Sequence, residues 1–254
     1  MYLQSETNII ISGRASSGTS VTALFLSYLL NKKYIYAGGT LKYFATRLGY
    51  DPKSKDIISF EKKYGDKWDI LWENYIAWKI GNSRNLLVDA KIAGFFADHQ
   101  PWLFEIFVMP DLEARKKRAG GDKRTEDIVQ RDQEHSTRWK RLFGIDILNE
   151  SQIRENYDYI LDNSSLTISQ TVFQIYKVMR EALGLKEIIA LPEIEKLETV
   201  YQAKGKSFLI ERIEQEGNII STSEILDDWK VKFADQITKL PSEWVKIITD
   251  SSNA

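Results

Sequence analysis

The chain has 254 residues, 43% of them apolar, so it can bury a sizeable core. Its 35 Lys and Arg residues balance 36 Asp and Glu residues, which argues against a general nucleic-acid or membrane binder. The absence of cysteine excludes disulfides, a thiol nucleophile and a Cys-based zinc site. Because neither a membrane-spanning run nor a signal-peptide pattern is visible, we expect a soluble cytoplasmic protein with no nucleic-acid or membrane partner.

Apolar runs separated by Gly and Pro predict alternating strands and helices over the first 185 residues. Strands are expected at residues 8–12, 34–36, 86–89, 103–109 and 159–161. Helices are expected at residues 21–30, 41–48, 66–80, from 112 onward, at 136–143 and at 168–183. This alternation predicts an α/β fold, a three-layer sandwich in which helices cover both faces of a parallel five-stranded sheet.

Beyond Gly184 the alternation stops, and three more helices are expected at residues 192–216, 221–235 and 241–248. We therefore divide the chain into a body (residues 1–185) and a helical C-terminal tail (residues 186–254). The tail has nine basic and thirteen acidic residues, so its helix-turn-helix appearance at 207–229 does not favour DNA binding. Its apolar residues predict packing on the body or on a second tail. We expect the second arrangement, a homodimer, because the body is complete without an addition.

Residues 13–20 form a Gly/Ser-rich loop between the first predicted strand and the first helix. Its two glycines have the spacing of the phosphate-binding motif G-x-x-x-x-G-K-S/T, in which backbone N–H groups and a helix N-terminus hold phosphate. The motif predicts an ATP site formed by Gly13, Ser16, Ser17, Gly18, Thr19 and Ser20. Ser20 has the position of the Mg²⁺ ligand, whereas Thr19 stands where the motif has lysine. The alternative interpretation is a Gly/Ser turn that binds nothing.

Five later segments carry further motifs. Residues 37–42 read Ala-Gly-Gly-Thr-Leu-Lys, residues 87–94 read Leu-Val-Asp-Ala-Lys-Ile-Ala-Gly, and residues 112–118 read Leu-Glu-Ala-Arg-Lys-Lys-Arg. After Arg131-Asp132, residues 138–146 read Arg-Trp-Lys-Arg-Leu-Phe-Gly-Ile-Asp, and residues 157–164 read Tyr-Asp-Tyr-Ile-Leu-Asp-Asn-Ser. In this order the segments resemble the cytidylate kinases, which are P-loop nucleoside-monophosphate kinases, and in particular the short archaeal ones. The resemblance covers residues 8–180.

The resemblance implies that the γ-phosphate of ATP is transferred, with Mg²⁺, to a nucleoside monophosphate, CMP or dCMP above all. It places Asn163 under the ATP base, and it implies that four residues act at the reacting phosphates: Asp89, Lys91, Arg131 and Arg138. For the acceptor it implies Ala37, Gly38, Lys42, Lys91, Arg118 and His135. The segment at residues 112–118 resembles the one that opens the family's lid. Arginine suits the lid because its planar group binds phosphate oxygens in pairs and keeps its charge.

Four residues depart from the family pattern. Thr19 replaces the loop lysine, Lys42 and Lys91 replace arginines, and His135 replaces an acid that binds the acceptor ribose. Two hypotheses therefore remain: an active phosphotransferase, or a catalytically impaired homologue that binds nucleotide in regulation or assembly. Lys91 is the residue that we expect to replace the missing loop lysine.

Some of these side chains also have purely structural interpretations. The lid arginines are compatible with a solvated basic helix face, and Asp89 is compatible with a helix cap or turn residue. We expect His99 and His135 to lie on the surface, too isolated for a metal site. The aromatic residues of the helix at 66–80 have the spacing of a packed core rather than of a base-stacking surface.

Overall fold

The computed structural model describes residues 6–52, 56–97, 99–120, 128–186 and 188–250. Five strands form one sheet in the order β2-β3-β1-β4-β5, and each pair is parallel. The strands are β1 (Asn8–Gly13), β2 (Lys33–Tyr36), β3 (Leu86–Asp89), β4 (Leu103–Val108) and β5 (Tyr159–Leu161). The predicted fold class and the predicted strands are confirmed.

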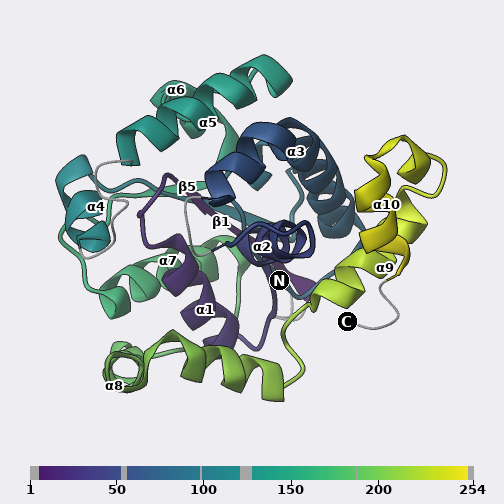
Figure 1. The fold of residues 1–254 in the computed structure, drawn as a ribbon. Helices are drawn as coiled ribbons and strands as arrows, with labels where there is room; N and C mark the ends of the chain where they lie inside the picture. The colour runs from purple at the N-terminus through teal and green to yellow at the C-terminus, as the bar shows by residue number, and fades with distance from the viewer. Residues whose placement is uncertain (1–5, 53–55, 98, 121–127, 187, 251–254) are drawn as a thin grey trace.

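Helices pack on both faces of this sheet (Figure 1). The α-helices are α1 (Thr19–Leu29), α2 (Ala37–Arg47), α3 (Asp56–Asn82), α4 (Leu112–Ala119), α5 (Ile128–Phe143), α6 (Glu150–Asn156), α7 (Ile168–Leu183), α8 (Leu191–Gln215), α9 (Thr222–Lys232) and α10 (Ser242–Thr249). Two short 3-10 helices are η2 (Ala93–Phe95) and η4 (Ile237–Lys239). The helix α3 begins at Asp56, well before its predicted start at residue 66. Gly65 lies inside the helix rather than in front of it.

Local sequence explains how the helices around the site begin and end. Gly18 precedes α1 with φ of 87°, a conformation that glycine adopts without strain. Thr167 caps the N-terminus of α7 and forms a capping box with Gln170, and Gly184 ends the helix with φ of 64°. Because β1 ends at Gly13 and α1 begins at Thr19, the loop at residues 13–20 lies at the carboxyl edge of the sheet.

Two apolar clusters, one on each face of the sheet, stabilise the fold. The first packs α1, α7 and α8 on the sheet, and the second packs α2, α3, α9 and α10 on the opposite face. Trp68, Trp72 and Tyr75 of α3 are buried in the second cluster. Core packing of this aromatic stripe is therefore confirmed.

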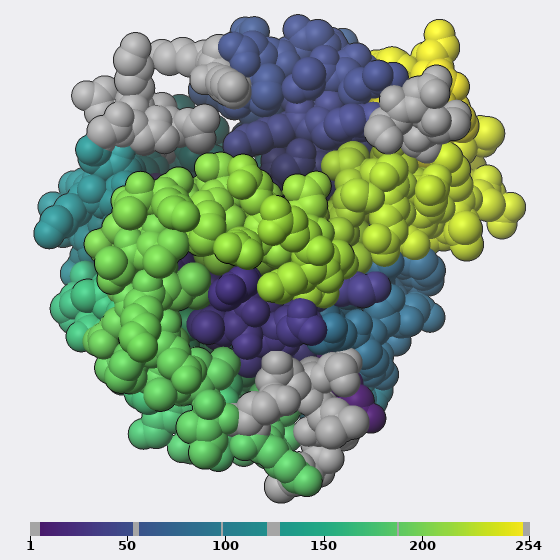
Figure 2. Space-filling view, turned by 90° about the horizontal axis from the view of Figure 1, so that it is seen from below, coloured from purple at the N-terminus to yellow at the C-terminus, as the bar shows by residue number. Residues whose placement is uncertain are grey.

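The tail contributes to both clusters. Leu209 of α8 is buried against the α1 and α7 side, whereas Trp229 of α9 and Trp244 of α10 are buried on the α3 side. Figure 2 shows the tail as a continuous band, from green to yellow, that lies across the purple surface of the first elements.

Between its two halves the tail runs along β2, the outer strand of the sheet, and pairs with it. The Tyr34 backbone N–H donates a hydrogen bond to the Asn218 carbonyl at 2.7 Å, and the Ile220 N–H donates to the Tyr34 carbonyl at 3.0 Å. The chain thus crosses from one face of the sheet to the other by way of a short parallel bridge between Tyr34 and Ile219.

This packing corrects the expectation of a homodimer through the tail. The expectation depended on a body that is complete without an addition, whereas the apolar tail residues are buried against the body of the same chain. A dimer is therefore not supported. Among the described residues, no helix combines the length and the apolar character that a membrane crossing requires.

Candidate functional site

The loop at residues 13–20 has the backbone that the phosphate motif predicts. A Cβ on Gly13 would lie 2.7 Å from the Val108 carbonyl oxygen and 2.8 Å from Thr19 Cγ2, so only glycine fits there. The hydroxyl of Ser17 is buried and has no hydrogen-bond partner in the described part of the chain. An unpaired buried hydroxyl in a Gly/Ser loop at a helix N-terminus is the feature expected of an anion site.

Asp89 lies beside this loop at the end of β3, and it is 6% exposed. Burial raises the pKa of its carboxyl, and the nearby hydroxyls of Ser20, Tyr34 and Thr19 offset this rise only in part. The bond from the Tyr34 hydroxyl is 3.1 Å long. A carboxylate and a hydroxyl held together are oxygen ligands of the kind that Mg²⁺ prefers, so Asp89 and Ser20 fit that ion.

Arg115 joins the lid to the loop. Its guanidinium forms a buried ion pair with Asp132 of α5 and donates from Nε to the Ala15 carbonyl at 2.7 Å. The N–H of Ala15 donates in turn to Asp132 at 3.2 Å. Arg115 is 4% exposed, so the interpretation as a solvated basic face does not apply to it. This ion pair ties the loop backbone to α4 and α5.

Arg118, predicted to bind the acceptor, contacts residues predicted to bind ATP. It donates to the side-chain oxygen of Asn163 at 3.0 Å and to the Asn163 carbonyl at 2.6 Å. Asn163 donates to the Ser17 carbonyl at 3.3 Å. Because Arg118 lies about one helical turn after Arg115, it faces the same side of the lid and meets the loop that follows β5.

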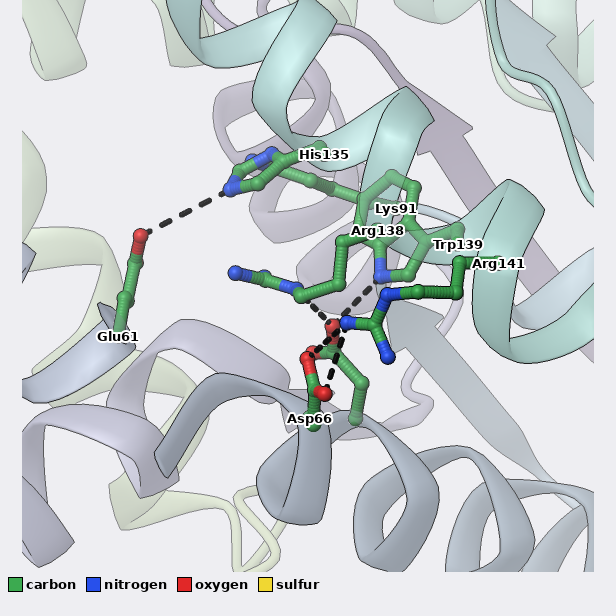
Figure 3. A network of polar contacts seen from close by, with 8 residues as sticks. Glu61, Asp66, Lys91, His135, Arg138, Trp139 and Arg141 are labelled. Carbon is green, nitrogen blue, oxygen red and sulfur yellow. Dashed lines mark hydrogen bonds and ion pairs between the residues drawn. The ribbon is translucent and has the colours of Figure 1, made fainter. Parts of the chain in front are cut away.

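On the other side of the lid, Lys91 contacts His135 and Glu61 lies beyond it (Figure 3). Lys91 Nζ lies 2.7 Å from His135 Nδ1, and His135 Nε2 lies 3.7 Å from a Glu61 carboxylate oxygen. His135 is 5% exposed, so its predicted surface position is wrong. The centroid of the His135 ring lies 4.9 Å from that of Trp139, a residue of the same helix. Trp139 in turn bonds to Asp69 of α3.

Burial sets the protonation of this group. Burial and the Lys91 charge lower the pKa of His135 to about 3, so the ring is neutral at pH 7 and accepts a hydrogen bond from Lys91. Burial and Arg131 lower the pKa of Lys91 to about 8. Burial alone would raise the pKa of Glu61, but the hydrogen bond from His135 and the nearby Lys91 and Arg131 cations contribute to lowering it to about 2.

The side chain of Arg138 is fixed by α3. It donates from Nε to Asp69 at 2.7 Å, and Trp139 donates to the same oxygen at 2.7 Å. A Cβ on Gly65 would lie 2.7 Å from Arg138 Nη1, so the glycine inside α3 makes room for the guanidinium. Arg141, one turn later, instead forms an exposed pair with Asp66 (Figure 3).

The remaining residues predicted for the acceptor follow β2 directly. Ala37, Gly38 and Lys42 lie in α2, and the ring of Tyr36 fills the space over Gly38, where a Cβ would lie 2.7 Å from the Tyr36 hydroxyl. On the same ring lies Nζ of Lys206, a tail residue, 4.9 Å from the ring centroid.

Comparison with known proteins decides the family. The chain is 31% identical over 172 residues to the cytidylate kinase of Sulfolobus acidocaldarius, an alignment that covers 62% of this chain and 86% of that protein. The chain belongs to the cytidylate kinase family. The cytidylate kinases of Saccharolobus islandicus and Methanosphaera stadtmanae are 28% and 29% identical over 178 residues, and 86% and 95% of their chains are covered.

No family model matches the chain. Among solved structures, the shikimate kinase of Bacteroides thetaiotaomicron aligns with a TM-score of 0.47 and 12% identity, over 68% of this chain and 98% of that one. This likeness is too low to bear on function. The alignments with the curated cytidylate kinases leave about a third of this chain unmatched.

The family motifs did not lead to two residues that lie beside the predicted site residues. Glu61 lies in the early turns of α3, ahead of the predicted start of that helix, so it had no predicted neighbour. Lys206 lies in the tail, outside the resemblance, and a Lys-Gly-Lys sequence inside a long helix carries no signal of a site. Only the folded chain brings these two side chains to the family's residues.

His99 is exposed as predicted but not isolated. Its Nδ1 lies 2.7 Å from a Glu105 oxygen, and with Asp158 these residues place three ligand atoms within 4.8 Å of one another. Burial and the Asp158 charge raise the pKa of Glu105 to about 8. The expectation that His99 is too isolated for a metal site is therefore wrong as to its isolation.

Proposed function

We propose that this protein transfers the γ-phosphate of ATP to a nucleoside monophosphate, with CMP or dCMP as the preferred acceptor. One observation supports the proposal: in a chain of the cytidylate kinase family, the loop at residues 13–20 lies beside Asp89 and is bonded to the lid. Transfer of a phosphoryl group needs positioning and charge neutralisation rather than covalent chemistry from the protein, and these residues supply both.

On the donor side, the loop at residues 13–20 would hold the phosphates of ATP, and Arg118 with Asn163 would line the part nearer the base. Asp89 and Ser20 would hold Mg²⁺, which neutralises phosphate charge when bound. The ion pair between Arg115 and Asp132 supports this arrangement from behind, since it fixes the carbonyl and the N–H of Ala15 within the loop.

On the acceptor side, the proposed cations come from three parts of the chain. Lys42 lies in α2, Lys91 follows β3, and Arg131 and Arg138 lie in α5. Among the described residues, Arg138 bonds to Asp69 through Nε, which would leave its terminal nitrogens for a ligand. Lys91 loses its charge more readily than the arginines of this set, because its pKa of about 8 lies close to physiological pH.

The test is a coupled assay of ADP release with ATP and Mg²⁺, run across CMP, dCMP, UMP, AMP and GMP. We expect the largest kcat/KM with CMP or dCMP. Asp89→Asn should lower kcat at least about 100-fold, the scale of one preorganised electrostatic group. Asp66→Asn, an exposed carboxylate of α3, is the matched control and should leave kcat unchanged.

Two other outcomes are informative. Nucleotide binding by calorimetry without turnover for any acceptor would favour the alternative of an impaired homologue with a regulatory or assembly role. No binding of ATP·Mg²⁺ at millimolar concentration would contradict both functions.

A further inference from the structure

The tail brings a lysine to the carboxyl edge of the sheet. In the middle of α8, Gly205 has φ of 79° and ψ of −177°, values that interrupt the helix and that glycine alone adopts readily. Lys206 follows this break, and its ammonium lies 4.9 Å from the centroid of the Tyr36 ring. Tyr36 is the strand partner of Asp89 in the β2–β3 pair, so Lys206 lies at the end of the strand that carries Asp89.

Two charged side chains, Asp89 and Lys42, act on the ammonium of Lys206. Burial lowers the pKa of Lys206, the Asp89 carboxylate opposes this effect, and the Lys42 cation adds to it. The nearby hydroxyls of Ser20 and Thr19 act on Asp89 in turn, and both lower the pKa of its carboxyl. Lys206 therefore shares the neighbourhood of Asp89 with Thr19, the position where the phosphate motif has its lysine.

The position of Lys206 is set by packing on both sides of it. Before the break, Tyr201 packs edge-to-face on Phe25 of α1 with a centroid separation of 5.4 Å. After the break, Leu209 and Ile213 are buried in the cluster around α1 and α7. A half-buried ammonium on a fixed segment is preorganised, which is the property that makes a cation effective against developing phosphoryl charge.

The lysine is also available. Within the described part of the chain, no ion pair or hydrogen bond engages its ammonium, and its one aromatic contact is with Tyr36. Lys91, the sequence-based candidate for the missing lysine, is instead bonded to His135 on the acceptor side of the lid. Lys204, two residues earlier in the tail, lies over the Phe208 ring at 4.7 Å, on an exposed part of the helix.

We propose that Lys206 is the phosphate-binding cation of this site and stands in for the lysine that the loop lacks at Thr19. Its ligand is the γ-phosphate of ATP, whose transfer is the proposed function on which this inference rests. The tail thus completes the site of its own chain, with a residue that lies beyond the part matched by the family's motifs.

The experiment compares Lys206→Met with Lys204→Met, which removes a lysine from the same segment. Lys206→Met should lower kcat roughly 100-fold and weaken ATP·Mg²⁺ binding at least about tenfold in calorimetry, with little change in KM for CMP. Lys204→Met should change neither quantity. In the Lys206→Met protein, Thr19→Lys should restore at least about tenfold of the lost kcat, because the loop lysine returns.

Thermal melting of each variant shows whether it is folded, and Lys206→Arg, which keeps the charge and the length, should retain activity and ATP affinity within about tenfold of the wild type. Unchanged kcat and ATP affinity in Lys206→Met would overturn the proposal. Higher kcat in Lys206→Met would overturn it too, since the lysine would then block the site. Both results leave the proposed function intact. The proposed function itself is contradicted by a different result, namely that the wild-type protein does not bind ATP.

Discussion

The body and the tail both bury tryptophans on the α3 side of the sheet, but they differ in what they bring to the site. The body supplies the loop, Asp89 and the lid arginines, so almost every group that would meet the nucleotides lies within the first 185 residues. The tail supplies large apolar side chains to both faces of the sheet and one cation, Lys206. A segment without the family's motifs can therefore be as necessary to the fold as the segment that carries them.

The edge strand β2 explains why the tail is needed. An edge strand exposes unpaired N–H and C=O groups, which natural proteins cover or pair. Here residues 218–220 pair with Tyr34, and the apolar faces of α8 and α9 lie on either side. In the body alone, that edge and the side chains beneath the tail would meet water.

Removal of residues 190–254 should have the largest effect. It would expose apolar surface in both clusters, and the free energy of unfolding of a domain is only about 5–15 kcal/mol. We expect the shortened chain to aggregate or to lose its cooperative melting transition in circular dichroism. A soluble shortened chain that melts cooperatively and still binds ATP would show that the body folds by itself and would remove the basis of the comparison.

Trp229→Ala tests the apolar part of the tail without deleting it. The indole is fully buried and packs against Phe44, Trp68, Trp72 and Tyr75 of the body. Its loss should lower the free energy of unfolding in urea by about 3–5 kcal/mol. Val231→Ala in the same helix, where the side chain is 74% exposed, should change it by less than about 0.5 kcal/mol. Equal effects of the two variants would mean that α9 does not pack on the body as described.

Asp228→Ala tests the polar part of the same interface. Asp228 accepts a hydrogen bond from the Tyr75 hydroxyl at 2.9 Å and pairs with the ammonium of Lys79 at 2.7 Å. Because Lys79 is only 8% exposed, we expect the free energy of unfolding to fall by about 1–3 kcal/mol. Asp227→Ala, which breaks the pair with Lys230 inside the tail, should cost less than about 0.5 kcal/mol. If Asp227→Ala lowered the free energy of unfolding as much as Asp228→Ala does, the loss would come from α9 itself and not from its contact with the body.

The difference between the two regions also determines what the sequence predicts. Strands, the loop at 13–20 and Asp89 depend on local patterns: a β-branched run, two glycines at a fixed spacing, an acid at a strand end. These features were predicted, and the structure has them. The burial of His135, the contact of Arg118 with Asn163 and the place of Lys206 depend on contacts between residues far apart in the chain. Such contacts follow from the packing of helices, which periodicity alone does not specify.

The last prediction separates a lysine of the body from the lysine of the tail by their response to pH. Burial and the charge of Arg131 lower the pKa of Lys91 to about 8, and all the charged groups that act on it belong to the body. A lysine is cationic below its pKa, so the Lys91 cation is present at pH 7 and is lost as the pH rises through about 8. If Lys91 binds the acceptor phosphate as proposed, kcat/KM for CMP should fall about tenfold for each pH unit above that value, because this parameter reports the free enzyme.

Lys91→Arg replaces this side chain by the arginine of the family pattern, which stays charged throughout the range. It should therefore abolish the alkaline fall between pH 8 and 9.5 while kcat/KM at pH 7 remains within about tenfold of the wild type. Lys206→Met should lower the whole profile and keep its alkaline fall, since the tail lysine acts on the donor phosphate and leaves Lys91 in place. A fall that persists in Lys91→Arg and disappears in Lys206→Met would reverse the assignment, with the tail lysine as the group that titrates and the body lysine as a structural partner of His135.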